Sequence, residues 1–142
     1  MKSIHILLVE DNEGDIVLTK DALEESKILN TISVARNGKE ALDYIFKKNE
    51  FQNAETPDII LLDINLPLKN GHEVLKIIKS DDSVKHIPVI MLTTSSSESD
   101  VLSSYKNYAS CFITKPVDVA AFIESLAGLN HFWLNIVTLN KK

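Results

Sequence analysis

Short apolar runs alternate along the chain with longer amphipathic stretches, and the alternation is regular. Most apolar runs have the length and the Val, Ile and Leu content of a buried strand, whereas the amphipathic stretches repeat their apolar positions at helical spacing. Strands are predicted over residues 4–9, 31–35, 59–62, 88–92 and 111–113. Helices are predicted over residues 15–26, 37–46, 71–78, 95–108 and 117–127.

This succession of strand-then-helix units predicts an α/β fold with a doubly wound, five-stranded parallel sheet. Each parallel connection needs an element that crosses over the sheet, and the helices supply it. Nearly continuous apolar strands are typical of a sheet that helices cover on both faces. The run at 31–35 is half polar, which favours an edge position. Right-handed crossovers favour the strand order 2-1-3-4-5.

Length and composition limit the classes of function. The chain has 142 residues and a formal net charge of −5, which suits one domain and argues against nucleic-acid binding. The single cysteine, Cys111, excludes an intramolecular disulfide. No apolar run reaches the roughly 18–20 residues that cross a bilayer, and the early acidic pair at residues 10–11 does not suit a signal peptide. We therefore expect a cytoplasmic protein that binds neither nucleic acid nor membrane.

Four predicted strands are followed by polar residues that could take part in chemistry. These residues are Glu10-Asp11, Asp63, Thr93-Thr94 and Lys115-Pro116. In a doubly wound sheet, ligands bind in the crevice outside the carboxyl ends of the strands. The first and third strands are neighbours in the predicted order, so we expect Glu10, Asp11 and Asp63 to converge there.

Three carboxylates that lie together need a counter-charge. Oxygen ligands without His or Cys favour Mg²⁺, and Lys115 supplies a fixed positive charge. A carboxylate beside Mg²⁺, a lysine and a hydroxyl has the parts of a phosphoryl-transfer site with aspartate as the nucleophile. Each residue alone also has an ordinary interpretation, such as a helix cap at Asp11 or Thr93. Their conjunction at the ends of successive strands favours the site.

In these residues the chain resembles the receiver domain of two-component response regulators, which has the CheY-like fold. The resemblance covers residues 4 to about 127 and rests on four motifs in order. They are LLVEDN at 7–12, ILLDINLP at 60–67, PVIMLT at 88–93 and FITKP at 112–116. The resemblance implies that the protein takes a phosphoryl group from a histidine kinase in a phosphorelay and signals through protein–protein contacts.

The same resemblance implies a role for each motif residue. Asp63 is the implied phosphorylation site. The implied Mg²⁺ ligands are Glu10, Asp11, Asp63 and the backbone carbonyl of Asn65. Lys115 would neutralise the acyl phosphate and Thr93 would bond a phosphoryl oxygen. The bond from Lys115 to Pro116 is expected to be cis, and the switch aromatic falls on Phe112, which has no hydroxyl.

The last residues carry a narrower resemblance. The segment HFWL at 131–134 is similar to the tail of small single-domain response regulators that accompany bacterial phytochrome-type histidine kinases. This divides the chain into a receiver domain at 1–128 and a C-terminal extension at 129–142. Apolar positions at 122, 126, 129, 133 and 136 predict that the last helix continues past Gly128. Such a helix would extend beyond the domain and expose an apolar patch at Phe132, Trp133 and Leu134, which predicts that a second copy of the chain covers it in a homodimer. The alternative is a tail that folds back on its own domain.

Two other functions on the same fold are weaker alternatives. A flavodoxin-like electron carrier needs a hydroxyl- and glycine-rich phosphate loop after the first strand, where this chain has Glu10 and Asp11. An aspartyl-phosphate hydrolase needs a second carboxylate two residues after the nucleophile, where this chain has Asn65. We therefore expect a protein that is not an enzyme, apart from catalysing its own phosphorylation and dephosphorylation.

Overall fold

The computed structural model describes residues 3–94, 109 and 111–127. The strands of this part are β1 (Ile4–Val9), β2 (Asn30–Ala35), β3 (Ile59–Asp63), β4 (Val89–Thr93) and β5 (Cys111–Thr114). The helices are α1 (Glu13–Glu25), α2 (Gly38–Ile45), the 3-10 turn η1 (Asn49–Phe51), α3 (Gly71–Lys79) and α5 (Val119–Ala127). The predicted helix at 95–108 and the extension at 129–142 lie outside the described residues.

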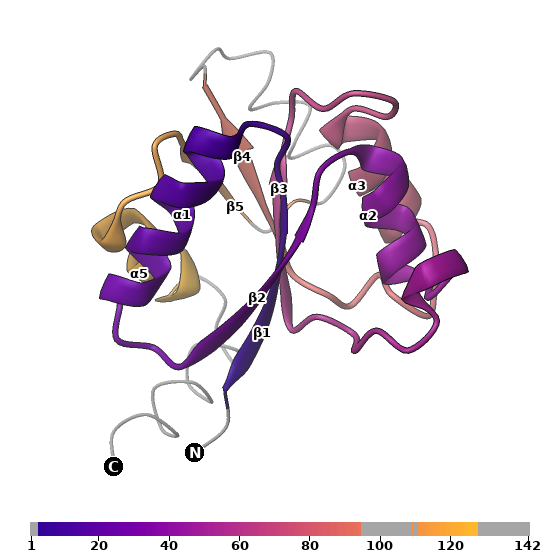
Figure 1. Cartoon of the computed structure of the whole chain (residues 1–142), viewed down its shortest axis with the longest axis horizontal. Coiled ribbons are helices and arrows are strands. Elements are labelled where there is room, and N and C mark those ends of the chain that lie inside the picture. The colour runs from indigo at the N-terminus through magenta and orange to yellow at the C-terminus, as the bar shows by residue number, and fades with distance from the viewer. Residues whose placement is uncertain (1–2, 95–108, 110, 128–142) are drawn as a thin grey trace.

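The five strands form one parallel sheet in the order β2-β1-β3-β4-β5, which confirms the predicted fold class and strand order. Helices α1 and α5 cover one face, and α2 and α3 cover the other (Figure 1). The half-polar strand β2 lies at an edge, as predicted. Val9 lies in register with Leu62, so β1 and β3 end side by side.

Two separate apolar clusters fill the two layers, because successive side chains of a strand point to opposite faces of the sheet. In β1, Ile6 and Leu8 pack towards α1 and α5, whereas Leu7 and Val9 pack towards α2 and α3. All four side chains are fully buried. This two-sided burial explains why the strands read as continuous apolar runs in the sequence.

Side-chain caps decide where the helices begin. Asn12, Asn37 and Asn70 each accept a hydrogen bond from the backbone N–H three residues later, which satisfies a donor that the first turn leaves unpaired. The Asn12 cap starts α1 at Glu13, two residues before the predicted start. The Asp118 carboxylate accepts from the Ala121 N–H, and α5 starts at Val119 rather than at residue 117. Both predicted starts were therefore wrong by two residues.

The connection after β3 packs so closely against its neighbours that it needs glycine. The Gly71 N–H donates to the Ile64 carbonyl at 2.8 Å. A Cβ atom at this position would lie 2.3 Å from the carbonyl oxygen of Asp63, so no larger residue fits without a backbone shift. Gly71 therefore lets α3 begin directly against the end of β3, where Asp63 lies.

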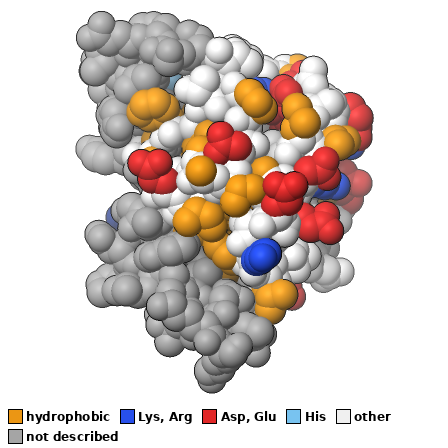
Figure 2. Space-filling model, turned by 90° about the vertical axis from the view of Figure 1, so that its left-hand side faces the viewer, with side chains coloured by type: hydrophobic (Ala, Val, Ile, Leu, Met, Phe, Trp, Pro, Cys, Tyr) orange, Lys and Arg blue, Asp and Glu red, His pale blue; other side chains and the backbone are white. Residues whose placement is uncertain are grey.

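The outer surface of the α1–α5 layer carries both apolar and acidic side chains (Figure 2). Val17 and Leu18 of α1 are about half exposed. Acidic residues Asp21 and Glu25 lie beside them on the same helix, opposite Asp118 across an open groove. Among the described residues, no helix is long and apolar enough to cross a membrane.

Candidate functional site

The acidic residues at the ends of β1 and β3 form one cluster. Glu10 directly follows β1 and is fully buried, Asp63 ends β3 and is 2% exposed, and Asp11 is exposed. Each offers a carboxylate oxygen within 4.8 Å of the others. The predicted convergence of these three residues is therefore confirmed, and it follows from the pairing of β1 with β3.

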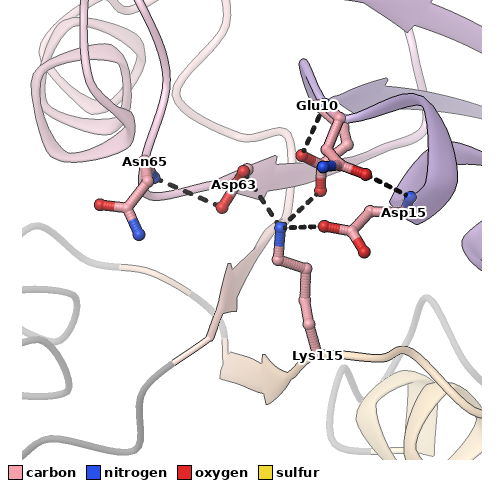
Figure 3. A network of polar contacts seen from close by, with 6 residues as sticks. Glu10, Asp15, Asp63, Asn65 and Lys115 are labelled. Carbon is pink, nitrogen blue, oxygen red and sulfur yellow. Dashed lines mark hydrogen bonds and ion pairs between the residues drawn. The ribbon is translucent and has the colours of Figure 1, made fainter.

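Lys115 reaches this cluster from the segment after β5 (Figure 3). Its Nζ donates to Glu10 Oε1 at 2.8 Å, to Asp15 Oδ2 at 3.0 Å and to Asp63 Oδ2 at 3.2 Å. The lysine side chain is only 7% exposed. A lysine that donates to three carboxylates in a water-poor environment holds the end of β5 against the ends of β1 and β3.

Burial and charge shift the acid–base properties of this cluster. The pKa of Glu10 is raised to about 7: burial is the largest cause, the hydrogen bond from Lys115 opposes the rise, and the nearby Asp63 adds to it. Burial alone would lower the pKa of Lys115, but the hydrogen bonds to Glu10 and Asp15 and the charge of Asp63 raise it above its usual value. Lys115 thus stays charged, whereas Glu10 takes up a proton more readily than usual, mainly because it is buried.

Of the other predicted site residues, Thr93 and Asn65 contact Lys115 and Asp63, whereas Phe112 lies within the sheet. Thr93 ends β4, is 1% exposed, and its carbonyl accepts from the Lys115 N–H at 2.7 Å. The Asn65 N–H donates to Asp63 Oδ1 at 3.3 Å. Phe112 lies on β5 in register with Met91 and is partly buried against the α2–α3 layer. The bond between Lys115 and Pro116 is cis, as expected.

Asp15 is the site residue that the sequence analysis missed. It lies in the first turn of α1, where its N–H donates to the Asn12 cap at 2.9 Å and its carboxylate turns towards Lys115. An acidic residue in the first turn of a helix is common because it complements the helix dipole. Because this role is so common, an acidic residue at this position does not by itself predict an ion pair with Lys115. The one available signal is its place four residues after the acidic pair at 10–11.

The donor set of the cluster fits a hard divalent cation. Glu10, Asp11 and Asp63 offer carboxylate oxygens, and no His or Cys of the described residues belongs to the cluster, which favours Mg²⁺ over softer metals. Glu10, Asp11 and Asp63 share the single ammonium of Lys115, so a further positive charge would be stabilising here. A buried aspartate between a cation site and a lysine can act as a nucleophile towards a phosphoryl group, because both cations reduce the repulsion between two anions.

Comparison with known proteins agrees with this geometry. The family model "Response regulator receiver domain" matches residues 6–127. Among curated proteins, response regulator Rcp1 of Synechocystis sp. is 40% identical over 134 residues, which are 94% of this chain and 91% of that protein. A structure of Rcp1 in its Mn²⁺-bound form is 39% identical, with a TM-score of 0.76, and covers 92% of this chain and 94% of that one.

Two further solved structures show the same similarity. The bacteriophytochrome response regulator RtBRR is 43% identical, with a TM-score of 0.85, over 93% of this chain and 81% of that chain. The phosphorylated cyanobacterial phytochrome response regulator RcpA is 43% identical, with a TM-score of 0.79, over 94% of this chain and 95% of that chain. The similarity spans all described strands and helices from residue 6 onwards.

Proposed function

Because the chain belongs to the response regulator receiver family, we propose that it is phosphorylated on Asp63 by a histidine kinase. The observation that carries this proposal is the place of the Asp63 carboxylate, between the cation cluster of Glu10 and Asp11 and the ammonium of Lys115. Lys115 binds the acyl phosphate, and the hydroxyl of Thr93 bonds a phosphoryl oxygen. Bound Mg²⁺ supplies the charge that offsets the incoming phosphoryl group.

The kinase is of the phytochrome type, and the protein acts in the cytoplasm. Support for the kinase comes from RtBRR and RcpA, which are described as bacteriophytochrome and phytochrome response regulators. The free thiol of Cys111 suits a reducing compartment. Phosphorylation adds about −1.5 to −2 charges at the crevice, and the change reaches partners through Thr93 and Phe112.

Phosphorylation of Asp63 is tested with a small phosphodonor. We expect the intact mass of the protein to increase by one phosphoryl group when phosphoramidate and Mg²⁺ are both present. Asp63→Asn should abolish the increase, whereas Asp82→Asn, which changes an exposed carboxylate paired with Lys85, should not. An adduct that survives Asp63→Asn, or that forms equally well in EDTA, would contradict the proposal.

Mg²⁺ affinity should depend on pH through Glu10. A carboxyl with a pKa of about 7 is mostly protonated at pH 6 and mostly ionised at pH 8, and only the ionised form neutralises a cation. The apparent affinity measured by calorimetry should therefore be about tenfold weaker at pH 6 than at pH 8. Glu10→Gln should bind weakly at both pH values. A wild-type affinity that does not change between them would contradict the assignment of Glu10.

Two copies of the chain pair through the extension at residues 129–142, which follows the receiver domain at 1–128. Phe122 and Leu126 are fully buried, and apolar positions continue in the sequence at the same spacing, at 129, 133 and 136. We expect sedimentation to show a dimer whose affinity falls about thirtyfold in Trp133→Ala. Leu68→Ala, at a 74% exposed position elsewhere, should not change it. A wild type that stays monomeric at high micromolar concentration would contradict the dimer.

A further inference from the structure

Lys115 has no N–H left for a new partner. An ammonium group has three N–H donors, and here three different carboxylates accept from them. Two of these acceptors, Glu10 and Asp63, belong to the cation cluster, whereas Asp15 does not. The contact to Asp15 is shorter than the contact to Asp63, at 3.0 Å against 3.2 Å.

The three acceptors differ in what happens to them on phosphorylation. The cation offsets the charge of Glu10, and Asp63 itself becomes the acyl phosphate. Asp15 is not one of the three carboxylates of the cation cluster, so neither the cation nor the phosphoryl group takes over its ion pair with Lys115. A phosphoryl oxygen that binds Lys115 must therefore compete with the carboxylate of Asp15.

The surroundings of Asp15 allow this competition. Its side chain is 30% exposed, so the carboxylate can exchange the ammonium for water without being left buried and unpaired. Its backbone is fixed by the hydrogen bond to the Asn12 cap. The helix start thus holds Asp15 beside Lys115 while leaving its side chain free to turn away.

We propose that Asp15 is a positioning residue that retains Lys115 in the unphosphorylated protein and competes with the phosphoryl group for it. This inference rests on the proposed function. Its consequence is that Asp15 slows phosphorylation and weakens the binding of phosphoryl mimics. With phosphoramidate in its nitrogen-protonated form (–NH3⁺), an Asp63 oxygen attacks phosphorus, the P–N bond breaks, and neutral NH3 leaves with the electron pair of that bond.

The test measures beryllofluoride, a phosphoryl mimic, at equilibrium in the presence of Mg²⁺. Asp15→Asn keeps the shape of the side chain but removes its charge. We expect it to bind beryllofluoride about tenfold more tightly than the wild type, which is the lower end of what a charge-assisted hydrogen bond contributes. Phosphorylation by phosphoramidate should become faster in the same variant. Asp15→Ala should behave likewise, which guards against an effect peculiar to asparagine.

Two controls separate competition for Lys115 from other effects. Glu13→Gln removes the other acid of the first turn of α1, which pairs with Arg36 instead of Lys115, and should leave the affinity unchanged. In a Lys115→Met background, kept folded by Mg²⁺, Asp15→Asn should have no further effect. An equal gain in that background would mean direct repulsion by Asp15 and would overturn the competition.

The outcomes for the two proposals are distinguishable. If the wild type binds beryllofluoride but Asp15→Asn binds it equally or less tightly, only the role of Asp15 is refuted. If the wild type neither binds beryllofluoride nor gains a phosphoryl group, the proposed function fails, and the role of Asp15 fails with it.

Discussion

Lys115→Met should lower the free energy of unfolding of the metal-free protein by about 3 kcal/mol at pH 8. The lysine side chain is nearly buried and donates to three carboxylates. Removing it leaves Glu10 and Asp63 as buried charges without the ammonium that balances them, and this costs more than the loss of an exposed ion pair. Urea denaturation in EDTA measures the effect.

The loss of stability should depend on pH and on metal. In the wild type, the raised pKa of Glu10 means that the folded state binds a proton more tightly than the unfolded state. That contribution is fully present below about pH 4.5 and is lost as the pH rises through 7. Protonation of Glu10 also removes one uncompensated charge, so Lys115→Met should lose less stability at pH 6 than at pH 8. Mg²⁺ should restore most of the loss.

The matched control is Lys20→Met, which changes an exposed lysine on α1. We expect it to alter the free energy of unfolding by less than about 0.5 kcal/mol. If Lys115→Met lost no more stability than this control, the lysine would contribute little to holding the cluster together. In the presence of Mg²⁺, Asp63 of Lys115→Met should still be phosphorylated by a phosphodonor. Phosphorylation should then no longer change the affinity of the protein for a partner or for a second copy of the chain.

The strands were predictable because the sheet is buried on both faces. A strand such as β3 has no solvent-facing position, so it reads as an unbroken apolar run that is hard to misplace. Helix starts were less predictable, because they depend on single side chains such as Asn12 and Asp118. An Asn or Asp before a helix is common, and only the structure shows which one accepts the hydrogen bond.

The centre of the site was predictable for a topological reason. Parallel strands that are neighbours end at the same edge, so the residues after β1 and β3 had to meet once the strand order was known. Asp15 does not follow a strand and gave no such signal. Its carboxylate meets Lys115 across a separation of 100 residues, through a helix orientation that no local pattern encodes.

Phe122→Ala should have the largest effect on stability of any single change on the α1–α5 side. Phe122 is completely buried, and it is among the largest side chains of the apolar cluster between the sheet and these helices. Truncation leaves a cavity that the surrounding strands cannot fill, so we expect a loss of about 3–5 kcal/mol in the free energy of unfolding.

This loss is a large part of the roughly 5–15 kcal/mol that stabilises a typical domain. Phe122→Leu keeps most of the volume and should cost about 1.5 kcal/mol, whereas Leu18→Ala, at a half-exposed position on α1, should change stability by less than about 0.5 kcal/mol. Phe122 belongs to the apolar cluster on the sheet and not to the carboxylate cluster. Mg²⁺ affinity should therefore not change in whichever Phe122 variant remains folded at 25 °C. If Phe122→Ala lost no more stability than Phe122→Leu, α5 would have to move and fill the cavity. The packing of Phe122 would then not hold α5, or the segment with Lys115 that precedes it, in a fixed position.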